Sequence, residues 1–173
     1  MQKGKMMRIM TASVFKRFPK RCDFESALTA KGYTHNPAGG SGGSIFMHAN
    51  RDLVWKIADD PATAEFADLL ASGWTDPAAP RVFLASPKGM PYSVLAMEKL
   101  NPLTFGCNWY TWYMQDYVAM KGSPHTDPYG ASAVLNFLRG EAHKRHVNLD
   151  VQPQNVMIRR GSPSQIVLFD PFY

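Results

Sequence analysis

The chain has little cysteine. Only Cys22 and Cys107 occur among its 173 residues, and two cysteines so far apart form neither a zinc-binding motif nor a disulfide framework. This scarcity fits a reducing compartment. No apolar run reaches the roughly 18 residues of a membrane-spanning helix, and the basic start of the chain is not followed by an apolar signal core. The sequence therefore predicts a cytoplasmic protein with no membrane partner.

Acidic residues are also scarce, with 14 Asp and Glu against 19 Lys and Arg, which gives a formal net charge of +5. Much of the excess lies near the start of the chain, at Lys3, Lys5, Arg8, Lys16, Arg17, Lys20 and Arg21. Such a segment can bind nucleic acid or acidic partners, but a solvated basic terminus is the more frequent case. We assign residues 1–36 to a basic N-terminal extension, with a short helix over Phe24–Lys31 that Asp23 caps.

No internal repeat is present, and the one low-complexity stretch is a glycine-rich segment at 37–44. A flexible linker is one interpretation of this segment. Two β-prone runs follow it at once, 45–48 and 53–57, around a polar turn. Glycines that lead straight into a hairpin favour the other interpretation, a loop over a ligand.

The rest of the chain predicts an α+β fold with two lobes. A helix is expected after Asp60, which caps it, and Pro61, which suits its first turn. Ala62, Phe66, Leu69 and Leu70 give that helix an apolar face. Further on we expect strands at 81–85 and 92–97, helices at 108–121 and 130–146, and a hairpin formed by 155–158 and 165–169. Strands and one helix thus come first, then helices, then a short hairpin, and this segregation is typical of α+β folds.

Three features of the first half suit phosphoryl transfer when taken together. Glycines let backbone N–H groups approach phosphates closely. Lys56, in a strand, supplies a point charge for phosphate oxygens, and Glu65, in the following helix, can hold that lysine in place. Each has a simpler explanation by itself: a linker, a snorkelling edge lysine and a solvated helix charge.

The second half is more specific. Asp150 and Asn155 have the Asp-x-x-x-x-Asn spacing of a kinase catalytic loop, and Asp170 ends a β-prone run further along. Asp150 would accept the proton of a hydroxyl group, while Asn155 and Asp170 offer the oxygen ligands that magnesium prefers. The simpler alternative is a turn aspartate, a capping asparagine and an Asp-Pro turn.

On these residues the chain resembles the protein-kinase-like superfamily from about 38 to 172. Within it, the chain is most similar to the compact early serine/threonine kinases of podophages, which also carry Asp-Pro in place of Asp-Phe-Gly. The loop from Asp150 is also similar to the Asp-x-x-Pro-x-Asn form of aminoglycoside-type phosphotransferases. The matching stretches are Gly43-Ser-Ile-Phe-Met-His48, Leu53-Val-Trp-Lys-Ile57, Leu149-Asp-Val-Gln-Pro-Gln-Asn-Val-Met-Ile158 and Phe169-Asp-Pro-Phe172.

The resemblance implies a minimal kinase-like domain over 37–173. Its N-lobe, an antiparallel sheet plus a helix, would span about 37–97, its hinge about 97–102, and a reduced, mostly helical C-lobe about 103–173. The implied cofactors are ATP and Mg²⁺. Gly40, Gly42, Gly43 and Ser44 would cover the phosphates, and Met97, Glu98 and Leu100 would hold adenine by their backbone. Lys56 would pair with Glu65, or with Asp68 one turn later; Asp150 would be the base, and Asn155 and Asp170 the magnesium ligands.

Two departures from that family bear on function. Gln152 stands where serine/threonine kinases carry a lysine that touches the γ-phosphate. The sequence ends three residues after Asp170, so we expect no activation segment and no peptide-docking platform, and a homodimer or a partner would then present the substrate.

Three functions remain open. The first is a serine/threonine kinase that phosphorylates host proteins in the host cytoplasm. The second is a kinase-fold binding protein that inhibits a host factor without catalysis. The third is a small-molecule phosphotransferase, which would need an acidic pocket for a cationic substrate.

Two other groups of residues have structural explanations. His143 and His146 suit the basic end of a helix better than a metal site, since nothing is placed to complete the ligand set. The aromatic run from Trp109 to Tyr117 can stack bases or bind a partner, but its spacing favours the packing of a helix.

Overall fold

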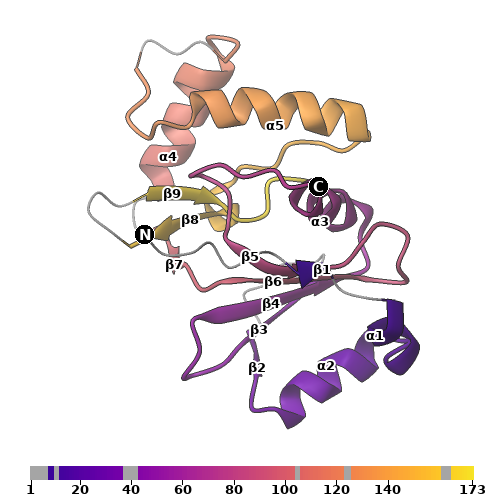
Figure 1. Ribbon diagram of the computed structural model, residues 1–173. Coiled ribbons are helices and arrows are strands. Elements are labelled where there is room, and N and C mark those ends of the chain that lie inside the picture. The colour runs from indigo at the N-terminus through magenta and orange to yellow at the C-terminus, as the bar shows by residue number, and fades with distance from the viewer. Residues whose placement is uncertain (1–7, 10–11, 37–42, 104–105, 123–125, 161–164) are drawn as a thin grey trace, which may run out of the picture. The chain divides into compact units, whose positions relative to one another are not determined.

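The structure is a computed structural model that describes residues 8–9, 12–36, 43–103, 106–122, 126–160 and 165–173 (Figure 1). The chain forms two compact units. Unit 1 consists of Met1–Trp74 and Arg81–Lys99, and unit 2 of Thr75–Pro80 and Leu100–Tyr173. Each unit has its own helices and its own sheet, so the predicted α+β class is confirmed.

Unit 1 is built on a six-stranded sheet with the order β1-β5-β6-β4-β3-β2. Every neighbouring pair is antiparallel except β1 with β5. The predicted hairpin is confirmed, because β3 and β4 pair directly with Lys56 opposite Ile45. The strands are β1 (Arg8–Ile9), β2 (Thr34–Asn36), β3 (Gly43–Met47), β4 (Leu53–Ala58), β5 (Val82–Ala85) and β6 (Ser93–Glu98).

Helix α3 (Pro61–Ala71) lies between β4 and β5 in the chain. Its predicted cap is confirmed, because Asp60 accepts hydrogen bonds from the backbone N–H of Thr63 at 2.7 Å and from its hydroxyl at 2.8 Å. The predicted apolar face is also buried: Ala62, Phe66, Leu69 and Leu70. Strands β2 and β3 thus pair on either side of the glycine-rich segment, β4 carries Lys56, and α3 with Glu65 follows.

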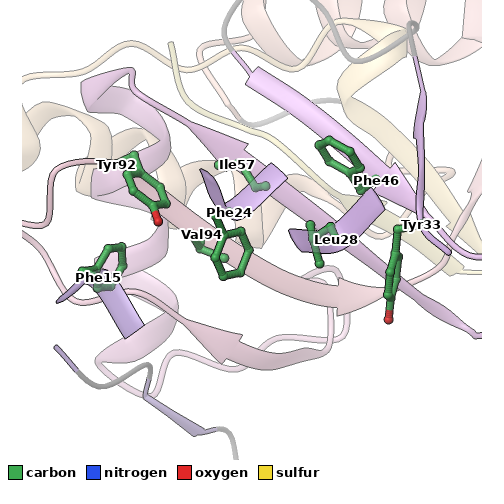
Figure 2. Packing of buried hydrophobic residues seen from close by; sticks show 8 residues of the cluster. All are labelled: Phe15, Phe24, Leu28, Tyr33, Phe46, Ile57, Tyr92 and Val94. Atoms are coloured by element: carbon green, nitrogen blue, oxygen red, sulfur yellow. The ribbon is translucent and has the colours of Figure 1, made fainter. Parts of the chain in front are cut away.

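Helices α1 (Ala12–Arg17) and α2 (Arg21–Ala30) lie on one side of the sheet and α3 on the other (Figure 1). Figure 2 shows the apolar side chains that join α1 and α2 to the sheet. The cluster consists of Phe15, Phe24, Leu28, Tyr33, Phe46, Ile57, Tyr92 and Val94. The described part of residues 1–36 is therefore packed into unit 1 and is not a separate extension. The abundant charge of this segment hid its apolar positions, which are few but spaced as on a helix.

The start of α2 differs from the prediction. The helix begins at Arg21, and Asp23 lies in its first turn instead of capping it. The Asp23 carboxylate accepts a hydrogen bond from the backbone N–H of Lys20 at 3.3 Å. This is the contact that an acidic residue at the third helical position makes with the residue before the helix, so the cap prediction was three residues late.

Unit 2 contains α4 (Gly106–Trp112), which continues into a π-helical turn, η1 (Tyr113–Val118), and α5 (Ser132–Arg145). The helices predicted at 108–121 and 130–146 are thus present, and His146, with φ 57°, ends α5. The predicted hairpin is formed by β8 (Val156–Arg159) and β9 (Gln165–Leu168), which β7 (Asn101–Pro102) joins. No helix in the described ranges is both long and apolar enough to cross a membrane.

The aromatic residues of α4 and η1 pack inward, as the sequence favours. Trp109, Trp112 and Tyr117 are buried, whereas Tyr110 is 41% exposed. The buried Tyr117 hydroxyl donates a hydrogen bond to Asn136 Oδ1 at 2.9 Å, and Asn136 in turn donates to the carbonyl oxygen of Gly122 at 3.1 Å. This network satisfies the polar end of a large core residue.

Two glycines of unit 2 should respond oppositely to alanine. Gly140 lies exposed within α5, and no described heavy atom is within 4 Å of an added Cβ. Gly140→Ala should therefore stabilise the protein by about 0.5–1 kcal/mol through helix propensity. Gly122 has φ +84°, and its Cβ would collide with Asn136 Oδ1, so Gly122→Ala should destabilise by at least about 1 kcal/mol. Urea unfolding measures both changes in stability. A stabilising Gly122→Ala would contradict the positive φ and the Asn136 contact described for Gly122.

Candidate functional site

Lys56 lies in the middle of β4, opposite Ile45 in β3 and Leu95 in β6. The residue is only 4% exposed, which is rare for lysine and requires polar compensation. Trp55 and Ile57 pack toward α1 and α2, and side chains alternate along a strand. Lys56 therefore points to the opposite face of the sheet and is not a snorkelling edge residue.

Glu65 lies in α3 and holds a lysine that the sequence did not suggest. Its Oε1 is 2.6 Å from Nζ of Lys88, which belongs to the connection between β5 and β6. The Glu65 side chain is largely buried while that of Lys88 is exposed, so solvent screening keeps this pair to about 1 kcal/mol or less. The pairing of Lys56 with Glu65 or Asp68 stays a prediction.

The glycine-rich segment is described only at its end, because Gly40 and Gly42 lie outside the described residues. Gly43 opens β3, where an added Cβ would be 2.9 Å from the carbonyl oxygen of Ile57 and 3.0 Å from Cβ of Ala58. A larger residue would therefore push β3 away from β4. The hydroxyl of Ser44 is buried and accepts a hydrogen bond from Nη2 of Arg21 at 2.7 Å. Its predicted contact with phosphate would then use its backbone.

The predicted hinge residues lie at the end of β6 and just beyond it. Met97 is fully buried, and Leu100 is half-buried in unit 2. The backbone N–H of Glu98 donates to the carbonyl oxygen of Arg81 at 2.9 Å, and that of Lys99 donates to Asp52 at 3.1 Å. Since both N–H groups are used within unit 1, adenine binding here would rely on carbonyl groups or on Leu100, and it stays a prediction.

In unit 2, backbone hydrogen bonds bring together the segments that carry Asp150, Asn155 and Asp170. The N–H of Phe169, next to Asp170, donates to the carbonyl oxygen of Asn155 at 2.9 Å. The N–H of Asp150 donates to the carbonyl oxygen of Pro171 at 2.7 Å. The three polar residues that the sequence singled out are therefore neighbours in the fold, although their catalytic roles stay predictions.

The Asp150 loop is held by its own hydrogen bonds and by one residue from α4. The N–H of Gln152 donates to Asp150 Oδ1 at 3.2 Å, which is the turn that the simpler interpretation predicts. Each carboxylate oxygen has two lone pairs, so this bond leaves the carboxylate able to accept a proton. The indole N–H of Trp109 donates to the carbonyl oxygen of Val151 at 2.8 Å in a buried position. Sequence reasoning missed this contact because no local pattern marks it.

Asn155 and Asp170 offer side-chain oxygens of the kind that magnesium takes as ligands, and a magnesium site here stays a prediction. The side-chain nitrogen of Asn155 donates to the carbonyl oxygen of Asp150 at 3.5 Å, so Oδ1 is the atom of this amide that can face a cation. The described residues contain no group of three His, Cys, Asp or Glu side chains able to hold a metal. One carboxylate and one amide suit magnesium, which keeps several waters and takes phosphate oxygens as further ligands.

Tyr113, Tyr117 and Arg139 lie close together in unit 2. Tyr113 stacks on Tyr117 with ring centroids 5.5 Å apart, and the Arg139 guanidinium lies 4.8 Å from the Tyr117 ring centroid. Burial, the largest effect, raises the pKa of Tyr113, while the positive charge of Arg139 and a hydrogen bond with it oppose that shift. Tyr113 therefore stays protonated at neutral pH.

Comparisons with known proteins add likenesses in structure. No protein-family model and no curated protein matches the chain. A crystal structure of Rad53 in complex with AMP-PNP is similar over 82% of this chain and 39% of that one, with 13% identity and a TM-score of 0.43. A crystal structure of the PknI kinase domain from Mycobacterium tuberculosis is similar over 80% of this chain and 59% of that one, with 19% identity and a TM-score of 0.40.

This chain thus spans less than two thirds of either structure. Because both TM-scores are below 0.5, the site assignment rests on the order of strands and helices and on the contacts given above, not on these likenesses.

Proposed function

We propose that the protein is a kinase that transfers the γ-phosphoryl group of ATP to a serine or threonine of another protein. The observation that supports this most is the set of backbone hydrogen bonds that make Asp150, Asn155 and Asp170 neighbours in unit 2. The β8–β9 hairpin and the bridge between Leu149 and Phe172 make these residues neighbours, and all three are of the kinds that phosphoryl transfer uses.

Each residue would have one task. Lys56 would bind phosphate oxygens, and Glu65 would hold Lys56. Asn155 and Asp170 would hold magnesium, which when bound neutralises charge on the phosphate oxygens. Asp150 would accept the proton of the substrate hydroxyl group while the oxygen of that hydroxyl forms a bond to the γ-phosphorus. The bond from that phosphorus to the β–γ bridging oxygen would break, and ADP would leave with the electron pair.

A protein is the favoured substrate. The segment after residue 121 is not rich in acidic residues, so it offers little to bind a cationic small molecule. By its resemblance to podophage kinases, the substrate would be a host protein, met in the host cytoplasm.

One observation favours a second candidate, a kinase-fold protein that binds a host factor without catalysis. Gln152 is exposed and its side-chain oxygen accepts a hydrogen bond from Gln154 at 2.7 Å. No positive charge therefore stands at this place in the loop, where related kinases have one that touches the γ-phosphate.

Nucleotide binding is the first test of the kinase proposal. ATP with magnesium at 100 times its dissociation constant should stabilise the folded protein by about 2.7 kcal/mol and raise its melting temperature by several degrees. Asp170→Asn should reduce this shift, and a chelator should abolish the magnesium-dependent part. If calorimetry detects no binding at millimolar ATP, the kinase proposal fails.

A further inference from the structure

Arg21, at the start of α2, makes three polar contacts in three directions. Its Nε donates to Glu25 Oε1 at 2.7 Å, its Nη1 to Asp59 Oδ2 at 2.9 Å and its Nη2 to the hydroxyl oxygen of Ser44 at 2.7 Å. The Arg21 side chain is only 27% exposed. A planar guanidinium with five N–H donors can serve three acceptors at once, which an ammonium group on a flexible chain does less well.

The partners of Arg21 stand at two places that matter for the proposed site. Ser44 is the second residue of β3 and follows Gly43, the described end of the glycine-rich segment. Asp59 follows β4 directly and precedes Asp60, the cap of α3. The Arg21 side chain thus forms hydrogen bonds both at the end of the predicted phosphate loop and next to the start of α3, the helix that carries Glu65.

The contacts of Arg21 differ in strength. Asp59 is 59% exposed, so its ion pair with Arg21 is screened by solvent and contributes little. The Ser44 hydroxyl is buried, and a buried polar group that loses its partner is costly. We therefore expect the Arg21–Ser44 hydrogen bond to matter most for the position of β3.

We propose that Arg21 is a positioning residue for phosphate binding, which it supports from the face of the sheet opposite Lys56. This inference rests on the proposed ATP-dependent function. It gives α2 a supporting role for the proposed phosphate site of unit 1. The positive charge of Arg21 then serves contacts within unit 1 and not contact with nucleic acid.

The test compares Arg21→Met with Arg17→Met. Arg17 is an exposed arginine of α1 whose guanidinium lies 5.3 Å from the Phe18 ring centroid, and it touches none of the site residues named here. Arg21→Met should raise KM for ATP about tenfold, as expected for the loss of charged hydrogen bonds, with little change in kcat at saturating ATP. Arg17→Met should change neither.

A second measurement does not depend on nucleotide. Amide hydrogen exchange in free protein should become faster at 44–47 and 60–65 in Arg21→Met and stay unchanged in Arg17→Met. If wild type binds no ATP, the kinase proposal fails, while this local exchange effect still shows whether Arg21 positions β3 and α3.

Two results would overturn the inference. One is an Arg21→Met protein with the exchange rates and KM of wild type. The other is a uniform rise in exchange over unit 1 with KM unchanged, which would mean that Arg21 only stabilises the unit. If Arg21→Met does not fold, Ser44→Ala takes its place in the test. Ser44→Ala removes only the hydrogen bond from Arg21 and should raise KM for ATP by a smaller factor. An unchanged KM in Ser44→Ala would count against the inference.

Discussion

Asp150→Asn is expected to lower the rate of phosphoryl transfer by about a hundredfold or more and to leave ATP affinity nearly unchanged. The carboxamide keeps the shape of the side chain but cannot accept the hydroxyl proton, and loss of a general base usually costs a factor in this range. The turn should persist, because an amide oxygen can accept the hydrogen bond from Gln152 as Asp150 Oδ1 does at 3.2 Å. Initial rates with labelled ATP, together with calorimetric ATP binding, measure the two effects.

Two variants make the comparison specific. Asp52→Asn applies the same chemical change to an exposed residue of unit 1 and should leave both rate and binding unchanged. Asp170→Asn should weaken binding of magnesium-ATP as well as the rate, because it removes a proposed metal ligand. If wild type and Asp150→Asn have equal biological potency in cells, catalysis is not the function and the binding-protein alternative replaces the kinase proposal.

Lys56→Met is expected to abolish transfer while the protein keeps its fold. Lys56 is buried at 4% exposure, and an unbranched apolar side chain of similar length fills the same space. The phosphate oxygens of ATP would lose their point charge. Thermal unfolding and transfer rates, measured on the same preparation, separate the two effects.

Lys88→Met is the matched control for Lys56→Met, since it makes the same change at a lysine that is 60% exposed and contacts Glu65. It should retain most activity. Glu65→Gln should reduce the rate less than Lys56→Met does. A larger loss with Asp68→Asn than with Glu65→Gln would identify Asp68 as the acid that holds the lysine, and full activity of Lys56→Met would refute the assigned role of this lysine.

Local patterns predicted the parts of the fold that local chemistry controls. The α3 helix was predicted with its cap, because Asp60, Pro61 and a regular apolar face lie within one short segment. The hairpins were predicted from β-prone runs around polar turns. The kinase-like spacing from Asp150 to Asn155 led us to expect Asp170 nearby. The backbone bonds from Asp150 to Pro171 and from Phe169 to Asn155 make the three residues neighbours, while their shared role stays a prediction.

Contacts between distant segments could not be read from the sequence. Nothing near Arg21 indicates that its guanidinium reaches Ser44 and Asp59. Nothing near Glu65 indicates Lys88. Residues 1–36 contain many charged residues, and their composition therefore predicted a solvated extension. Their burial depends instead on a few apolar residues, which pack against a sheet whose strands come later in the chain.

The division of the chain into two units determines which fragments of the protein can fold by themselves. Residues 75–80 belong to unit 2 although unit 1 surrounds them in the sequence. The carbonyl oxygen of Ala78 accepts from the N–H of Leu168 at 2.8 Å, and Arg159 donates to Pro77 at 2.7 Å and to Ala79 at 2.8 Å. A gene fragment that starts at Leu100 would lack the carbonyl oxygens of residues 77–79. A fragment that stops at Lys99 would contain these oxygens but lack their donors, Arg159 and Leu168. On the ribosome, this segment emerges early and must wait for β8 and β9 before its hydrogen bonds can form, so unit 2 completes its folding only after β9 has been made.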